Sequence, residues 1–133
     1  MAYLLDSNLV IPYLADDPAT VVLVDRLAPQ GLAISIITYL EAYQGTLRDP
    51  DHQLAQEQFE HFLAVVPILP LSPAVARRCA RLREELKRRG RRVRDRAFDL
   101  VFAATALENG YTLVTRNGKD YDDVPDLSLD SFR

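Results

Sequence analysis

Residues 2–6 read AYLLD, an apolar run that ends abruptly in a carboxylate. A strand that is apolar on both faces is typical of the centre of a parallel sheet covered by helices on either side. Asp6 then falls at the carboxyl end of that strand, where open α/β sheets usually bind ligands. This position leaves two interpretations of Asp6: it caps the next helix, or it belongs to a site.

The rest of the chain alternates helical and strand-like patterns. Helices are expected at residues 9–14, 18–28, 38–47, 51–65, from 73 to near 90, and 97–110. Strands are expected at residues 32–36, 66–70 and 111–115, with a weaker one at 127–129. Strands that alternate with helices predict an α/β fold, a three-layer α/β/α sandwich with a mainly parallel sheet, formed by one domain over residues 1–133.

Composition narrows the class of protein. Of the residues, 48% are apolar and 26% charged, and the longest apolar run, FLAVVPILPL at residues 62–71, is too short to span a bilayer. Cys79 is the one cysteine, so no internal disulfide is possible, and with two histidines there is no Cys/His zinc cluster. No signal peptide is visible. We therefore expect a cytoplasmic protein without membrane association, in which Cys79 is a small packed side chain.

The net charge of −3 hides an asymmetry. Residues 77–96 contain 11 of the 16 Lys and Arg residues and three acids, so this segment carries +8 and the remainder −11. Such a basic segment can neutralise nucleic-acid phosphates. It is also consistent with a solvated helix in which Glu84 and Glu85 pair with Lys87, Arg88 and Arg89.

Two further carboxylates stand out. Asp99 lies in AFDLVFAATAL (residues 97–107), a helix that is apolar on almost every face, so it is expected to be partly buried and to need a partner. Arg94 or Arg96 is the ordinary candidate. Glu41 follows Thr38 in a T-x-x-E capping box, where its side chain would bond back to the backbone of Thr38.

Together, these carboxylates suggest a different explanation. In an α/β sheet, strand ends and helix starts meet in one cleft, and clustered like charges persist mainly when a cation lies between them. Oxygen ligands without His or Cys favour a hard cation, Mg²⁺ or Mn²⁺. Magnesium commonly binds phosphate as well, so the pattern predicts phosphodiester hydrolysis.

Three segments resemble the PIN-domain ribonucleases, and most closely the VapC-type toxins of toxin–antitoxin pairs. They are LLDSNLVIPYL (4–14), SIITYLEAYQG (35–45) and FDLVFAATALENGYTLVTRNGKDYDDVPDLSL (98–129). By position, the resemblance implies that Asp6, Glu41 and Asp99 are catalytic metal ligands. It implies supporting roles for Ser7, Asn8, Thr115 and Asn117. Ser7 replaces the threonine that the family usually carries, and either it or Asn8 could be a helix cap and nothing more.

The resemblance is imperfect at the fourth acidic position. Many relatives carry aspartate where this chain has Asn117. Asp120 could supply the missing charge as a metal ligand, or three carboxylates could suffice. Asp122 and Asp123 are expected to be solvated.

The resemblance also implies a function. We expect a Mg²⁺-dependent endoribonuclease that leaves a 5′-phosphate and a 3′-hydroxyl, forms a homodimer, and is inhibited by an antitoxin protein. RNA is expected to contact Arg88, Arg89, Arg91 and Arg92. One rival is a receiver-like signalling domain, but that fold needs an aspartate at the end of a middle strand, and residues 66–70 have none. The other is a PIN fold that only binds RNA or a partner, its cleavage weakened by Asn117.

Overall fold

A five-stranded sheet forms the centre of the computed structural model, which describes residues 2–131. The strand order is β3-β2-β1-β4-β5, and every pair of neighbours is parallel. The strands are β1 Tyr3–Leu5, β2 Leu32–Ser35, β3 Ile68–Leu69, β4 Thr112–Thr115 and β5 Leu129–Ser131. The expected limits of the domain, residues 1 and 133, lie outside the described residues.

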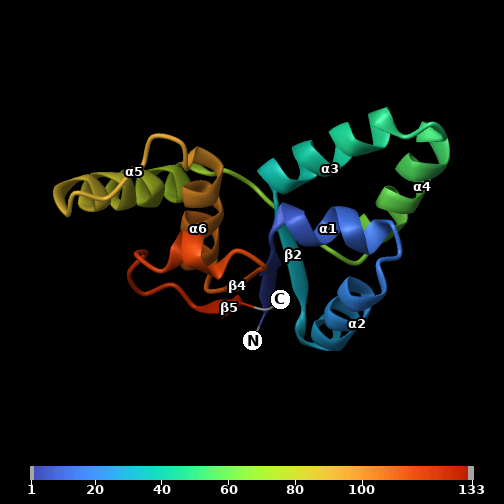
Figure 1. The fold of residues 1–133 in the computed structure, drawn as a ribbon, viewed down its shortest axis with the longest axis horizontal. Helices are drawn as coiled ribbons and strands as arrows, with labels where there is room; N and C mark the ends of the chain where they lie inside the picture. Colours follow the sequence, from blue (N-terminus) through green and yellow to red (C-terminus); the bar gives the residue numbers. More distant parts are fainter. Residues whose placement is uncertain (1, 132–133) are drawn as a thin grey trace.

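Helices cover both faces of this sheet, which confirms the predicted α/β/α sandwich (Figure 1). On one side lie α1 Ser7–Leu14, α2 Pro18–Leu27, α3 Ile36–Arg48 and α4 His52–Leu63. On the other lie α5 Pro73–Arg88 and α6 Ala97–Asn109. Two short 3₁₀ helices, η1 Ala28–Gln30 and η2 Gly118–Tyr121, complete the chain. Within residues 2–131, no helix combines the length and apolarity needed to cross a membrane.

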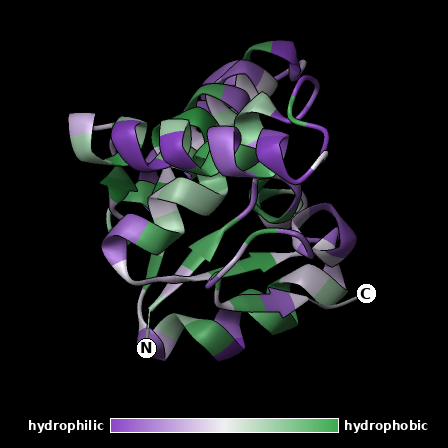
Figure 2. Cartoon of the chain, turned by 90° about the vertical axis from the view of Figure 1, so that its left-hand side faces the viewer, coloured by the Kyte–Doolittle hydropathy of each residue, from purple (hydrophilic) through white to green (hydrophobic). Residues whose placement is uncertain are grey.

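Side chains that alternate along the central strands build a core on each face of the sheet. Leu4 and Leu113 pack with α5 and α6, whereas Leu5 and Val114 pack with α1, α2 and α4. All four are at most 1% exposed. Figure 2 shows largely hydrophobic colours on the central strands. Burial on both faces explains why residues 2–6 are apolar without alternation.

The prediction that a helix starts at Thr38 was wrong. The helix α3 begins at Ile36, and its cap is Ser35, whose hydroxyl accepts the Thr38 N–H at 3.1 Å. Ser35 has two roles, because it both ends β2 and caps α3. Glu41 therefore lies in the second turn of the helix, where a capping box cannot form, and its side chain is available for other partners.

The edge strands also differ from the prediction. β3 has two residues, because Pro67 and Pro70 flank it and proline has no N–H to donate to a ladder. β5 begins at Leu129 rather than at residue 127, because the chain is still turning after Asp126, whose φ is 65°.

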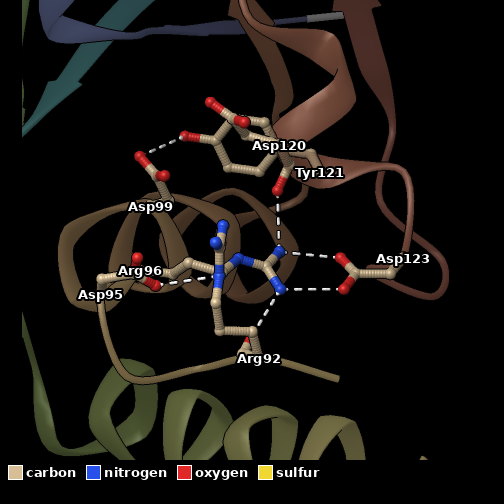
Figure 3. A network of polar contacts seen from close by, with 7 residues as sticks. All are labelled: Arg92, Asp95, Arg96, Asp99, Asp120, Tyr121 and Asp123. Atoms are coloured by element: carbon tan, nitrogen blue, oxygen red, sulfur yellow. Dashed lines mark hydrogen bonds and ion pairs between the residues drawn. The ribbon is translucent and has the colours of Figure 1, made fainter. Parts of the chain in front are cut away.

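Arg96 fastens η2 to the start of α6 (Figure 3). Its guanidinium donates to both carboxylate oxygens of Asp123 at 2.8 Å, to the Asp120 carbonyl at 2.7 Å and to the Arg92 carbonyl at 2.8 Å. Both ion-pair partners are nearly buried, with side chains 8% and 10% exposed. The prediction that Asp123 is solvated was therefore wrong. Its hydrogen bonds to Arg96 hold the pKa of Asp123 below its ordinary value.

Asp123→Ala is expected to lower the free energy of unfolding by about 3 kcal/mol, because it leaves the Arg96 guanidinium buried without its counter-ion. Asp122→Ala, at an exposed neighbouring position, is the matched control and should change stability by less than about 0.5 kcal/mol. Urea unfolding at neutral pH measures both. Equal effects of the two substitutions would show that the Arg96–Asp123 ion pair contributes nothing to the free energy of unfolding.

The contribution of Asp123 should depend on pH. Because its pKa is lowered in the folded protein, the stabilisation is complete above the ordinary aspartate pKa of about 4 and is lost as pH falls through the lower folded value. The stability difference between Asp123→Ala and the parent should therefore narrow in acid. A difference that stays constant down to pH values below about 2 would contradict this.

Candidate active site

The site forms at the carboxyl edge of the sheet. Asp6 directly follows β1, and its backbone N–H donates to the Val114 carbonyl at 3.0 Å. Thr115 is the last residue of β4, and Ser35 is the last of β2. Because β1, β2 and β4 are parallel neighbours, these three strand ends lie together.

A cleft of about 460 Å³ opens at this edge. Asp6, Ser7 and Asn8 line it from the start of α1, Glu41 from α3, and Asp99 from α6. A larger hollow of about 560 Å³ lies between residues 89–91 and 122–125. Its carboxylates are Asp122 and Asp123, and Asp123 is already paired with Arg96, so the smaller cleft is the better candidate for chemistry.

Each of the three cleft carboxylates accepts a hydrogen bond from the hydroxyl of a different residue. The Ser7 hydroxyl donates to Glu41 at 2.5 Å, and the Thr115 hydroxyl donates to Asp6 at 2.7 Å. The Tyr121 hydroxyl donates to Asp99 at 3.2 Å. Neutral donors thus orient the carboxylates without neutralising their charge.

Behind Ser7, the hydroxyls form a buried chain. Ser35 donates to Thr38 at 3.3 Å, and Thr38 lies 3.1 Å from Ser7. Because the Ser7 hydrogen goes to Glu41, Thr38 donates to Ser7. Ser35, which caps α3, and Thr38 therefore also hold the start of α1. Ser7 is not a helix cap, because Asp6 caps α1, and its hydroxyl instead orients Glu41.

Asp6 has both of the roles that the sequence left open. One of its oxygens accepts the Asn8 N–H at 3.3 Å as the cap of α1, and the other accepts the Thr115 hydroxyl. Thr115 in turn accepts the Asn117 N–H at 3.0 Å, which directs the loop after β4. Asp6 is 4% exposed.

The electrostatics at Asp99 reflect crowding by acids. Burial raises its pKa, and the negative charges of Asp6 and Asp120 raise it further, against the hydrogen bond from Tyr121. Burial and the charges of Asp6, Asp99 and Asp120 raise the pKa of Tyr121, so its hydroxyl keeps its proton and stays a donor. Asp99 does not pair with Arg96, because the guanidinium binds Asp123 instead.

The donor set fits a hard divalent cation in its chemistry, because the cleft offers carboxylate, hydroxyl and amide oxygens and no His or Cys. Within residues 2–131, no three acidic, histidine or cysteine side chains stand close enough together to hold one ion as they are placed here. Coordination by all three carboxylates therefore requires side-chain movement toward a common point.

The other predicted residues lie around the cleft rather than in it. Asn117 and Asp120 are exposed and do not line it, although the charge of Asp120 is felt at Asp99. Exposed positions at the end of α5 and in the following loop are occupied by Arg88, Arg89, Arg91 and Arg92.

Sequence reasoning missed Tyr121 and Phe98. Tyr121 is 2% exposed and reaches Asp99 from a loop that reads as polar and solvated, so its neighbours give no signal of its burial. Phe98 lines the cleft, yet it sits in a helix most of whose other apolar residues form the core.

The chain is similar throughout its length to known proteins. It is 28% identical to the tRNA(fMet)-specific endonuclease VapC of Shigella flexneri, over 99% of this chain and 98% of that protein. It is 28% identical to ribonuclease VapC1 of Haemophilus influenzae, over 96% and 95%. Among solved structures, VapBC2 of Rickettsia felis bound to a promoter DNA fragment gives a TM-score of 0.84 at 27% identity and covers all of both chains. The structure of FitAcB from Neisseria gonorrhoeae gives a TM-score of 0.82 at 27% identity, and the match covers 96% of this chain and 95% of that chain.

The sequence also matches a protein family, described as PIN domain, over residues 3–127. This match covers β1 to the segment just before β5, and so includes every element that lines the cleft. The resemblance seen in the sequence is confirmed: this chain belongs to the PIN domain family.

Proposed function

We propose that this protein is a divalent-metal-dependent endoribonuclease and the toxin of a toxin–antitoxin pair. The observation that carries the proposal is the meeting of Asp6, Glu41 and Asp99, from three separate elements, in one cleft, each held by its own hydroxyl. The ribonuclease names of the relatives and the VapBC complexes among the similar structures support it.

A Mg²⁺ or Mn²⁺ ion bound there would activate a water molecule and offset charge on the phosphate. The chain's own part is to supply and orient the ligands: Asp6 is fixed by Thr115, Glu41 by Ser7, and Asp99 by Tyr121. We also propose that Asp120 adds the fourth negative charge in place of Asn117. Its influence on the pKa of Asp99 supports this.

Basic residues beside the cleft support an RNA substrate. A hollow lined by Arg91, Arg92 and Lys119, together with Asp120, Asp122 and Asp123, adjoins the cleft at Arg96, which lines both. Arg89 pairs with Glu85 at 2.9 Å and Lys87 with Glu84 at 3.3 Å, as the solvated-helix interpretation predicted. Arg92 pairs with Asp95 at 3.0 Å, which that interpretation did not include. These arginines are more than half exposed, and exposed ion pairs contribute little, so phosphate can compete for the guanidinium groups.

The alternative is a catalytically weak PIN protein that binds RNA or a partner, and Asn117 favours it, because an amide brings no charge. Incubation of the purified protein with an RNA panel, with Mg²⁺ or with a chelator, decides between the two. Cleavage that needs the metal supports the nuclease. Binding without cleavage supports the alternative.

We further propose an antitoxin partner and a homodimer. Copurification tests the antitoxin partner, and size-exclusion chromatography with light scattering tests the homodimer.

Asp6→Asn, Glu41→Gln and Asp99→Asn should each reduce the RNA cleavage rate by at least about 100-fold, because each removes a charged ligand rather than an outer-shell partner. Asp25→Asn, on α2 and outside the cleft, is the matched control and should cleave like the parent. Circular dichroism should show unchanged helix content in all four. A cleft variant that cleaves at the parent rate would remove that residue from the ligand set.

Tyr121→Phe should raise the Mg²⁺ concentration needed for half-maximal cleavage by about 10-fold, because it frees Asp99 to rotate. Tyr111→Phe, which removes a hydroxyl outside the cleft, is the control. The increase in melting temperature caused by Mg²⁺ gives a readout independent of activity. This increase should be smaller for Tyr121→Phe than for the parent or for Tyr111→Phe. Identical metal responses in all three would exclude a positioning role for this hydroxyl.

Replacing Arg88, Arg89, Arg91 and Arg92 together by glutamine should weaken RNA binding for all sequences and flatten its dependence on salt. The salt slope should fall by about 0.7 for each phosphate that the variant no longer neutralises. Arg77→Gln with Arg81→Gln is the control, because both residues lie on α5 at least seven positions before Arg88. Their neighbour Arg78 pairs with Glu108 near the end of α6 that is remote from Asp99. If the fourfold variant kept the parent's affinity and salt slope, the four arginines would be a solvated surface.

A further inference from the structure

Phe98 is exposed at the rim of the cleft. It is the second residue of α6, and 49% of its surface is accessible, whereas Leu100 and Phe102 of the same helix are 0% and 3% exposed. Within residues 2–131, its ring packs against no other aromatic ring. The core therefore does not account for an aromatic residue here. A large, half-exposed ring thus lines the cleft together with the carboxylates.

Arg94 lines the same cleft with an unused charge. It is exposed, and it makes no ion pair or hydrogen bond within the part of the chain that the structure describes. Its neighbours differ in this respect: Arg92 pairs with Asp95, and Arg96 pairs with Asp123. The first turn of α6 and the loop before it thus bring a free cation and a free aromatic ring to one cleft.

These two groups match the two parts of a nucleotide. Aromatic rings stack on the bases of single-stranded RNA, and a guanidinium pairs with its phosphate. We propose that Phe98 and Arg94 form a grip for one nucleotide, with the ring on the base and the guanidinium on the phosphate. The grip rests on the proposed ribonuclease function and would hold a nucleotide next to the bond that is cut, because Phe98 and Arg94 line the same cleft as Asp99.

The base contact is tested with a thermodynamic cycle on binding, in which one step changes residue 98 and the other removes the bases from the RNA. The probes are fluorescein-labelled oligouridine and oligoadenosine of about 12 nucleotides and an all-abasic ribose-phosphate strand of the same length. Affinity is measured by anisotropy in EDTA, so that no strand is cleaved. The variants are Phe98→Leu, which removes the ring, and Phe98→Tyr, which keeps it. The control is Tyr43→Leu on α3, which removes a 41% exposed ring outside the cleft.

Phe98→Leu should weaken binding of at least one base-bearing strand by about 5-fold or more and leave the abasic strand unchanged. Phe98→Tyr and Tyr43→Leu should bind like the parent. Equal losses for base-bearing and abasic strands, or no loss at all, would overturn the grip. So would a change in oligomeric state without a change in RNA affinity, because Phe98 would then belong to a protein interface.

The phosphate contact has its own test. Arg94→Gln should weaken binding of base-bearing and abasic strands alike and reduce the salt slope by about 0.7, the value of one single-strand phosphate contact. Arg78→Gln is the control, because the guanidinium of Arg78 already pairs with Glu108, and this substitution should leave the salt slope unchanged. An unchanged slope for Arg94→Gln would remove Arg94 from the grip.

Failure of the proposed ribonuclease function is separable from failure of the grip. Binding is measured in EDTA, whereas cleavage is measured in Mg²⁺ with the parent protein. If the variants show the expected loss of base binding but the parent does not cleave RNA, the proposed ribonuclease function is refuted and an RNA-binding grip remains. A parent that cleaves RNA and shows no coupling between Phe98 and the bases would refute the grip alone.

Discussion

The central constraint on this structure is the repulsion among carboxylates gathered at one edge of a parallel sheet. The parallel order of β1, β2 and β4 brings strand ends together, and the helices that follow carry Asp6 and Glu41 into the same cleft as Asp99. Burial, and to a smaller extent the charge of Asp6, raise the pKa of Asp99, as expected of a carboxylate in such a group. Hydroxyl donors offset part of that cost, so buried polar residues such as Thr38 and Thr115 belong to the site as much as to the core.

The basic segment, residues 77–96, is divided between structure and surface. Arg96 is buried and fastens η2 to α6, whereas Arg89 and Arg92 lie in exposed ion pairs and Arg94 has no partner within residues 2–131. Only the exposed members can meet a substrate without unfolding part of the chain. The charge of +8 read from the sequence therefore overstates what is available to RNA by at least the one charge that Arg96 uses internally.

The sequence was informative where one local pattern decides the outcome. Apolar strands, proline at helix starts and a carboxylate in an apolar helix led to the sandwich and to Asp6 and Asp99 in one cleft. Prediction failed where a residue's partner is distant in the chain. The start of α3 was missed for a different, local reason: Ser35, three residues before Thr38, both ends β2 and caps the helix. Asp123 looked solvated because its partner lies 27 residues away, and Tyr121 gave no local sign that it reaches Asp99.

The choice of partner for Arg96 determines what the cleft can bind. A salt bridge from Arg96 to Asp99, three residues on, would have satisfied the buried carboxylate and cancelled its charge. The guanidinium instead binds Asp123 with both carboxylate oxygens, and Asp99 receives only the neutral Tyr121 hydroxyl. Arg96 lines the cleft, but its guanidinium is held by the loop that carries Tyr121 and makes no ion pair with Asp99. The charge of Arg96 still lowers the pKa of Asp99, but less than burial raises it. Among the described residues Asp99 thus has no ion-pair partner, which leaves its carboxylate available to an external cation.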